Sequence, residues 1–127
     1  LGTFDTILML GNNFGLFASA AKARRVLRRF NRFTRPGATL IAESLNVYET
    51  KDPDHLGYQA ANRERGRMSG QIRMRARYKR FVTPWFDYLM VSPGEMAELV
   101  DGTGWRVAKQ YGGAGARLYT AIIERTD

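Results

Sequence analysis

The feature that most constrains the fold is a pair of short apolar runs separated by one amphipathic segment, all within the first 44 residues. The first run, residues 7–10, is typical of a strand buried on both faces of a parallel sheet. Residues 18–34 predict a helix, because apolar side chains recur there at spacings of three and four. The second run, residues 37–44, predicts another strand. A strand, a helix and a strand in this order indicate a right-handed parallel crossover.

The predicted helix has one apolar face, and lysine and arginine side chains take the rest of its surface. The apolar face consists of Ala23, Val26, Leu27, Phe30 and Phe33. The basic face is either a phosphate-binding surface or an ordinary solvated helix face, and the solvated face is the favoured interpretation. Pro36 and Gly37 are expected to end the helix.

Polar residues follow both predicted strands. Gly11, Asn12 and Asn13 come directly after the first run, and Glu43 lies at the end of the second. In open α/β sheets, ligands bind in the crevice beyond the carboxyl ends of the strands. We therefore expect a site at this edge. The alternatives are a surface turn after the first strand and a solvated end of the second.

The composition is that of one globular domain without metal or disulfide chemistry. The chain has 127 residues, 44% of them hydrophobic, and no run that resembles a membrane span or a signal peptide. Cysteine is absent, and the single histidine, His55, cannot build a multi-histidine metal centre. We expect a cytoplasmic protein. Because the chain starts at Leu1 and enters a strand almost at once, we also expect a fragment, a processed product or a trimmed chain.

The net charge of +8, from 20 basic and 12 acidic residues, favours anionic partners. The basic residues are concentrated in two clusters, residues 22–35 and 63–80. From charge alone we expect weak, non-specific binding to nucleic acid at low salt. This binding should disappear near physiological salt, because it would be only counterion release.

Residues 46–70 are the least regular part of the sequence. Asp52, Pro53 and Asp54 are a turn or helix-start signal, and residues 55–65 predict a short helix that ends at Gly66. Because this helix has few apolar residues, we expect it to lie over the site, as lids and binding loops do. The side chains here with useful donors and acceptors are Tyr48, His55, Tyr58 and Asn62.

A hairpin is predicted next. Four apolar residues alternate with four cations, in the order Ile72, Arg73, Met74, Arg75, Ala76, Arg77, Tyr78 and Lys79. This period of two predicts one half-buried antiparallel strand over residues 72–79, and residues 85–91 predict the returning strand. We expect the four cations to share one exposed face. Such a face suits RNA, an acidic small molecule, or plain solvent exposure that protects an edge strand.

The last third of the chain predicts a helix and a second hairpin. Ser92 and Glu95 form a capping box with proline at the first helical position, and two glycines end the helix. Residues 105–111 and 118–124 predict antiparallel strands. The glycine-rich residues 112–115 between them are a poor phosphate loop, because they do not lead from a buried strand into a helix.

Taken in order, these segments resemble the C-terminal half of a class I S-adenosylmethionine-dependent methyltransferase. Five stretches in this order and spacing carry the resemblance: residues 4–10, 35–38, 92–96, 102–107 and 118–124. The resemblance implies an α/β fold with a partial Rossmann-like methyltransferase sheet, in which a parallel strand–helix–strand unit is followed by antiparallel hairpins. It also implies that residues 1–127 are a single domain, the C-terminal part of a methyltransferase domain. Residues 46–91 would be an insertion with a hairpin on the substrate side.

Two parts of that family's pattern have no counterpart in this sequence: the glycine-rich loop after its first strand and the acidic residue that ends its second. Those parts hold most of the cofactor. The resemblance therefore implies that S-adenosylmethionine is contacted only at its methionine end, by the strand-end segment Leu10, Gly11, Asn12, Asn13 and Phe14. It identifies no catalytic residue. The isolated chain is expected to bind the cofactor weakly or not at all and to be inactive.

Candidate substrate contacts are chosen by position and chemistry, not by a motif. They are Tyr58, Arg75, Tyr78 and Trp85. A small-molecule acceptor is expected in preference to nucleic acid, and its identity is open. No membrane partner is expected.

Three functions remain open: part of a methyltransferase, a basic nucleic-acid-binding module, and a non-catalytic fragment that assembles with itself. In the first, the edge of the strand at residues 4–10 is unpaired, and an open apolar edge recruits another chain. We therefore expect either a homodimer, which could exchange segments, or a missing N-terminal half as the partner.

Overall fold

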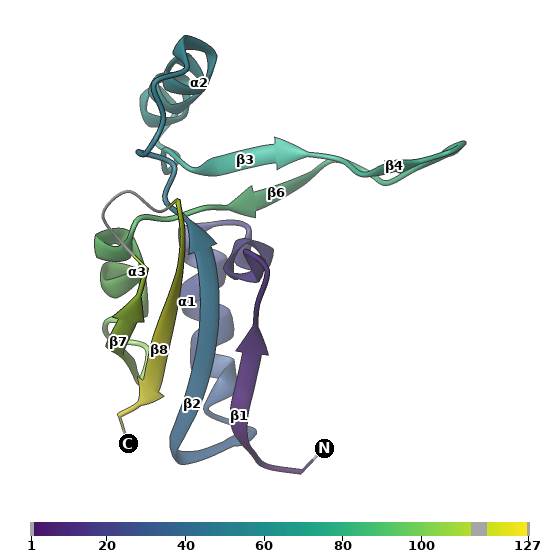
Figure 1. The fold of residues 1–127 in the computed structure, drawn as a ribbon. Coiled ribbons are helices and arrows are strands. Elements are labelled where there is room, and N and C mark those ends of the chain that lie inside the picture. The colour runs from purple at the N-terminus through teal and green to yellow at the C-terminus, as the bar shows by residue number, and fades with distance from the viewer. Residues whose placement is uncertain (1, 113–116, 127) are drawn as a thin grey trace.

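In the computed structural model, which describes residues 2–112 and 117–126, a four-stranded sheet forms the body of the molecule (Figure 1). The strand order is β1 (Phe4–Met9), β2 (Thr34–Leu45), β8 (Leu118–Arg125) and β7 (Trp105–Tyr111). β1 and β2 are parallel, and β8 is antiparallel to both of its neighbours. The predicted α/β sheet, parallel first and antiparallel afterwards, is confirmed. Most of the glycine-rich connection, residues 113–116, lies outside the described residues.

The helices lie on one face of this sheet and at its upper end (Figure 1). A short 3₁₀ helix, η1 (Asn13–Phe17), and α1 (Ala20–Phe30) connect β1 to β2, and α1 lies behind the sheet. α3 (Pro93–Val100) packs against α1 and β7. α2 (Pro53–Glu64) lies above the sheet, beyond the end of β2.

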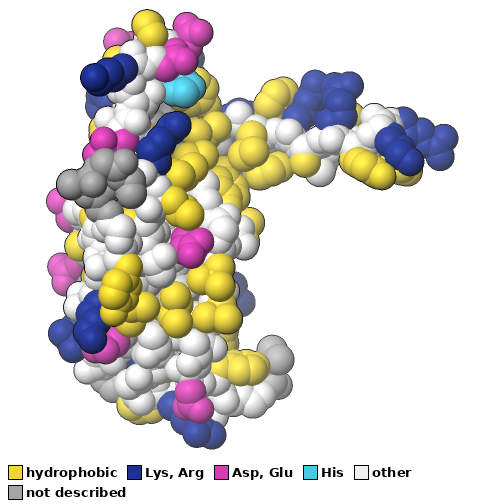
Figure 2. Space-filling view, in the orientation of Figure 1, with side chains coloured by type: hydrophobic (Ala, Val, Ile, Leu, Met, Phe, Trp, Pro, Cys, Tyr) yellow, Lys and Arg dark blue, Asp and Glu magenta, His cyan; other side chains and the backbone are white. Residues whose placement is uncertain are grey.

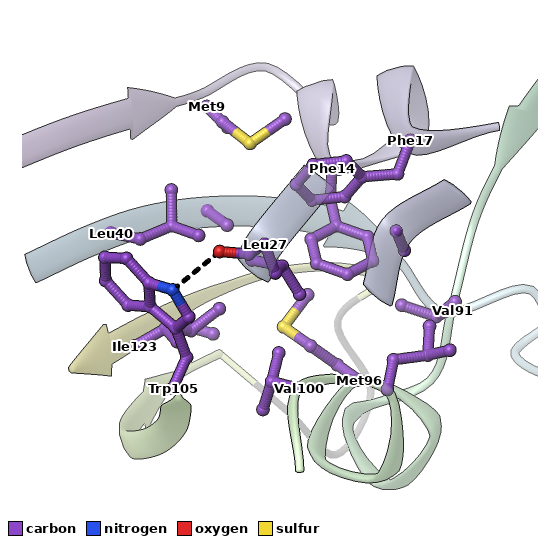
Figure 3. Packing of buried hydrophobic residues seen from close by; sticks show 14 of the residues in the cluster. Met9, Phe14, Phe17, Leu27, Leu40, Val91, Met96, Val100, Trp105 and Ile123 are labelled. Atoms are coloured by element: carbon purple, nitrogen blue, oxygen red, sulfur yellow. Dashed lines mark hydrogen bonds between the residues drawn. The ribbon is translucent and has the colours of Figure 1, made fainter. Parts of the chain in front are cut away.

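The hydrophobic core lies between the sheet and helices α1 and α3 (Figure 3). Leu40 of β2, Ile123 of β8 and Leu27 of α1 are all fully buried. Trp105, only 2% exposed, donates an indole hydrogen bond to the carbonyl of Leu27 at 3.0 Å. This bond satisfies the one polar atom of the indole in an apolar setting.

Arg24 of α1 shows that the basic helix face is not only a solvated surface. Its guanidinium donates to the carbonyls of Glu98 at 3.1 Å and Asp101 at 2.9 Å. These carbonyls lie near the C-terminal end of α3, where backbone acceptors lack partners within the helix. Arg24 therefore joins the two helices that cover the sheet.

The predicted helix over residues 18–34 was too long. α1 ends at Phe30, whose carbonyl accepts the Thr34 hydroxyl at 2.8 Å. Pro36 and Gly37 do not end the helix but lie inside β2, at a register shift where pairing moves from Phe4↔Thr34 to Thr6↔Thr39. Such an irregularity tolerates proline, and Gly37 has a positive φ of 78° there.

The first strand was wrongly predicted to be buried on both faces. β1 is the last strand of the sheet in the described chain, and Phe4 and Leu8 are 44% and 61% exposed. Within the described chain, only β2 pairs with β1, so the other edge of β1 is open. The helices cover only one face of the sheet (Figure 1). The open edge expected for this strand is therefore present.

The basic hairpin is an arm that projects from the body (Figure 1). Its base pairs β3 (Gln71–Met74) with β6 (Phe86–Leu89), and its tip pairs β4 (Arg77–Tyr78) with β5 (Phe81–Val82). The prediction of one continuous, half-buried strand was wrong, because every residue from 73 to 86 is exposed. The four cations are exposed as expected, but Tyr78 is also 69% exposed, and Lys79 lies in the turn with a φ of 53°. Because residues 73–86 project away from the body, neither face of this part of the arm packs against the hydrophobic core, and the apolar residues of the alternating pattern beyond Ile72 stay exposed.

No helix in the described part of the chain is long and apolar enough to cross a membrane.

Candidate functional site

The turn after β1 is bound to the end of β2. Gly11 and Asn12 both have left-handed backbones, with φ values of 68° and 65°. The Gly11 amide donates to Glu43 Oε2 at 2.6 Å, and Asn12 Oδ1 accepts the Leu45 amide at 3.0 Å. Glu43, expected only as a carboxylate at the sheet edge, therefore fixes the turn that follows the neighbouring strand.

Tyr88 of β6 holds the same turn from the arm. Its hydroxyl donates to the carbonyl of Asn12 at 2.6 Å and lies 3.2 Å from Asn13 Oδ1. Its ring packs so closely on Gly15 that a Cβ there would lie 2.0 Å from Tyr88 Cε1. Burial raises the pKa of Tyr88 above its ordinary value, so the hydroxyl stays protonated and donates at neutral pH.

The five predicted cofactor contacts divide into a turn that is exposed except for the half-buried Asn12, and one core residue. Leu10 is 45% exposed, and Gly11 and Asn13 are also exposed, whereas Phe14 is fully buried and packs edge-to-face on Phe17. Within the described chain, the side-chain amide nitrogens of Asn12 and Asn13 donate to no other residue. These donors fit the carboxylate of an amino acid, as the methionine end of S-adenosylmethionine presents one.

A groove of about 510 Å³ lies where the arm meets the body, and we name it the arm-base groove. Its lining residues come from η1, the start of α1 and the strands of the arm: Leu16, Ala18, Lys22, Arg73, Trp85, Phe86, Asp87 and Tyr88. Because Tyr88 also bonds Asn12, the groove adjoins the turn after β1. Asp87 Oδ2 is paired with Arg67 at 2.7 Å and accepts from Gln71 at 2.9 Å.

A second pocket of about 440 Å³ lies under α2, and we name it the α2 pocket. It is more enclosed and more apolar than the arm-base groove, with Val47, Ile72 and Met90 among its lining residues. His55 also lines it, with Nδ1 3.0 Å from the Thr50 hydroxyl. The arm-base groove is the better candidate for chemistry next to the turn after β1, because Tyr88 lines this groove and its hydroxyl also bonds the turn at Asn12.

The four predicted substrate contacts do not meet in one place. Tyr58 lines the α2 pocket, where its hydroxyl accepts the Arg73 amide at 2.9 Å. Trp85 lines the arm-base groove, and the guanidinium of Arg75 lies over the Trp85 ring, 4.6 Å from its centroid. Tyr78 lies near the tip of the arm, away from both pockets.

Sequence reasoning missed Lys22, Tyr88 and Asp87 as residues of the candidate site. Lys22 was assigned to a general basic face, and the other two to a strand of alternating pattern. Tyr88 and Asn12 are 76 positions apart, so no local signal joins them.

Comparisons with known proteins address the fold. No family model and no curated protein matches the sequence. The structure is similar to a SAM-dependent methyltransferase from Bacteroides fragilis, solved with S-adenosyl-L-homocysteine, with a TM-score of 0.74 and 23% identity. That similarity covers 96% of this chain and 48% of the other.

Two further methyltransferase structures are similar. One is a SAM-dependent methyltransferase from Methanosarcina mazei, with a TM-score of 0.66, 13% identity, and coverage of 98% of this chain and 60% of that one. The other is the CcbJ methyltransferase from Streptomyces caelestis, with a TM-score of 0.62, 10% identity, and coverage of 99% and 59%. This chain spans about half to three fifths of these proteins. It has the class I fold of about half of a SAM-dependent methyltransferase.

Proposed function

We propose that this chain is part of an S-adenosylmethionine-dependent methyltransferase and supplies the methionine end of the cofactor site together with the acceptor side of the active site. The observation that carries the proposal is the turn after β1. It lies at the carboxyl edge of the parallel strands, where ligands bind in α/β sheets, and Glu43, Leu45 and Tyr88 hold it in place.

The side-chain amides of Asn12 and Asn13 would hold the carboxylate of the cofactor's methionine end. Their oxygens are already used, by the Leu45 amide and the Tyr88 hydroxyl respectively, so the amide nitrogens are the groups left to a ligand in the described chain. The turn is preorganised, because its left-handed backbone is fixed by bonds from two strands. Phe14 would support the turn from the core and not touch the ligand.

When bound, S-adenosylmethionine supplies a methyl group on a sulfonium sulfur that a nucleophile can take. The contribution of this chain is to position the acceptor, since such a transfer depends mainly on alignment of the reacting atoms. The arm-base groove adjoins the turn through Tyr88 and is of the size that small-molecule sites have. We assign the acceptor to this groove.

The rest of the cofactor site would come from a partner that covers β1, either a missing N-terminal half or a second copy. Two features of the sheet support this. β1 has an open edge, and in α/β domains a parallel sheet is usually covered on both faces, whereas the described chain places helices on one (Figure 1).

The proposal is tested by nuclear magnetic resonance on the ¹⁵N-labelled chain with S-adenosylhomocysteine at millimolar concentration. We expect saturable shifts of the backbone amides of residues 11–13, and no such shifts with adenosine, which lacks the methionine end. The amides of residues 102–104, at the opposite end of the sheet, serve as the internal control (Figure 1).

A pair of variants sharpens this test. Asn13→Asp keeps an acceptor for the Tyr88 hydroxyl but replaces the free amide donor by a carboxylate, which repels the ligand's own. It should abolish the shifts, whereas Gln110→Glu, which makes the same amide-to-carboxylate change at an exposed residue of β7, the strand at the other edge of the sheet, should keep them. The proposal fails if residues 11–13 do not respond, or if adenosine shifts them equally.

A further inference from the structure

Two cations in the arm-base groove lack acidic partners. Lys22 and Arg73 line the groove, and neither forms an ion pair with any residue that the structure describes. Asp87 also lines the groove, and its charge is paired with Arg67, because its Oδ2 accepts from Arg67 at 2.7 Å and from Gln71 at 2.9 Å. Its Oδ1 is buried and has no hydrogen-bond partner within the described chain. A ligand with negative charge would therefore find two unpaired cations in this groove.

The remaining walls of the groove are largely aromatic. Trp85 and Phe86 line it and are 53% and 39% exposed, although such side chains are usually covered. Arg75 holds the Trp85 ring, since its guanidinium lies 4.6 Å from the ring centroid. A flat ring could stack on these aromatic side chains without a change in the fold.

The groove is also next to the proposed site of methyl transfer. Tyr88 forms part of its wall, and the same hydroxyl bonds the turn at Asn12 and Asn13. Its volume of about 510 Å³ lies in the range of small-molecule sites.

We propose that the arm-base groove binds an anionic group attached to a flat ring, so that the methyl acceptor is an aromatic or heteroaromatic acid. Lys22 and Arg73 pair with the anion, and Trp85 stacks on the ring. Arg75 is a positioning residue that acts through Trp85. The identification of this ligand as the acceptor rests on the proposed function, whereas the binding of the acid does not.

The test uses 2-naphthoate as the probe and its neutral isostere 2-naphthamide as the comparison. The chain has two tryptophans, so the indole N–H resonances report on two places. Trp85 lines the groove, whereas Trp105 is buried and bonded to the Leu27 carbonyl. We expect 2-naphthoate to shift the Trp85 resonance saturably, to leave that of Trp105 unchanged, and to bind roughly threefold or more tightly than the amide.

Substitutions separate this groove from the α2 pocket. Lys22→Gln combined with Arg73→Gln should weaken 2-naphthoate roughly threefold to tenfold, the range that two exposed ion pairs supply, and should leave 2-naphthamide unaffected. Arg117→Gln removes a cation that lines the α2 pocket, and it should leave the affinity for both probes unchanged. All these side chains are exposed, so the fold should persist.

Three results would overturn the proposal: equal binding of acid and amide, a loss caused by Arg117→Gln, or no saturable shift of Trp85. The two cations could instead serve the cofactor's carboxylate. In that case the double variant would weaken the shifts that S-adenosylhomocysteine causes at residues 11–13, and 2-naphthoate would not bind. If 2-naphthoate binds as expected but S-adenosylhomocysteine does not, the proposed function fails while the acid site stands.

Discussion

At the scale of single residues, two glycines set how closely the arm approaches the body. A Cβ on Gly15 would lie 2.0 Å from Tyr88 Cε1, and a Cβ on Gly70 would lie 1.8 Å from the carbonyl oxygen of Met90. Real side chains do not tolerate such distances. These positions therefore need glycine for the space it leaves, since neither has a positive φ.

We predict that Gly15→Ala destabilises the protein by about 2 kcal/mol, because the Tyr88 ring must move and its hydroxyl bonds to Asn12 and Asn13 are lost. Urea unfolding measures the change. Gly57→Ala is the matched control, since no atom lies within 4 Å of its added Cβ. Inside helix α2 it should stabilise by about 0.5 kcal/mol. A Gly15→Ala protein as stable as the parent would show that the Tyr88 contact is absent in solution.

The buried hydroxyl of Tyr119 leads us to predict that the protein loses stability at alkaline pH. Its hydroxyl donates to the Val91 carbonyl at 2.7 Å, and burial raises the pKa of Tyr119 well above its ordinary value. The unfolded chain loses this proton from about pH 10, but the folded chain keeps it. The contribution to the free energy of unfolding is therefore fully present below about pH 10, and it falls as pH rises toward the folded-state pKa.

The measurement is urea unfolding at pH 8 and again above pH 10. Tyr119→Phe should lower the free energy of unfolding by about 1 kcal/mol at pH 8, because the Val91 carbonyl loses its donor. Between pH 8 and the higher pH, this variant should lose less stability than the parent protein does, because it has no hydroxyl to ionise at position 119. Tyr111→Phe, at a side chain that is 56% exposed, should follow the parent at both values. Parallel behaviour of Tyr119→Phe and the parent would contradict the assignment.

At the scale of secondary-structure elements, local capping determines where the helices begin. Ser92 Oγ accepts the Glu95 amide at 3.2 Å, and Glu95 Oε1 accepts the Ser92 amide at 2.9 Å. Glu95 also accepts the hydroxyl of Tyr48 at 2.9 Å, which ties the start of α3 to the segment after β2. One cap therefore fixes both a helix start and a loop.

Ser92→Ala should destabilise the protein by about 1 kcal/mol, because an amide at the start of α3 loses its acceptor. Ser92→Thr keeps a hydroxyl in the same place, so this variant should lose much less stability than Ser92→Ala. Thermal unfolding followed by circular dichroism compares the three proteins. Equal losses for both variants would mean that the volume at this position, and not the hydroxyl, matters.

At the scale of the whole molecule, the uncovered face of the sheet is apolar at its centre. Leu8 pairs with Ile41, and Ile41 pairs with Ile122, so these three side chains form a row across β1, β2 and β8. Figure 2 shows hydrophobic side chains on the face turned to the viewer and on the arm, where lysine and arginine also gather. Exposed apolar surface of this kind favours association.

We propose that the isolated chain forms a homodimer through β1 and this face. Leu8→Lys places a charge in the row at a residue that is 61% exposed, so it should shift the protein toward monomer in sedimentation velocity experiments. Leu56→Lys, on α2 at a residue 47% exposed, should leave the distribution unchanged. A parent chain that sediments as a monomer across the micromolar range would refute the proposal.

The sequence by itself determined what depends on neighbours a few positions away. The capping box at Ser92, the helix that follows Asp52 and the turn at Gly11 and Asn12 are all where the pattern predicts them. The capping box and the helix start depend on hydrogen bonds within a few residues. The turn is predictable because glycine and asparagine tolerate a left-handed backbone, although distant residues hold it in the fold. The two apolar runs likewise predict the parallel pair β1 and β2, because alternatives for such a strand, helix and strand are few.

Only the tertiary structure decided which surfaces those elements share. The alternation at residues 72–79 predicts a buried face, yet the arm leaves the body and exposes both faces. The candidate site depends on the contact of Tyr88 with Asn12, 76 positions apart, and of Glu43 with Gly11, 32 positions apart. A periodic pattern records that a side chain is apolar or charged. It does not record what the folded chain places against it, and that determines whether the side chain is buried, free or bound.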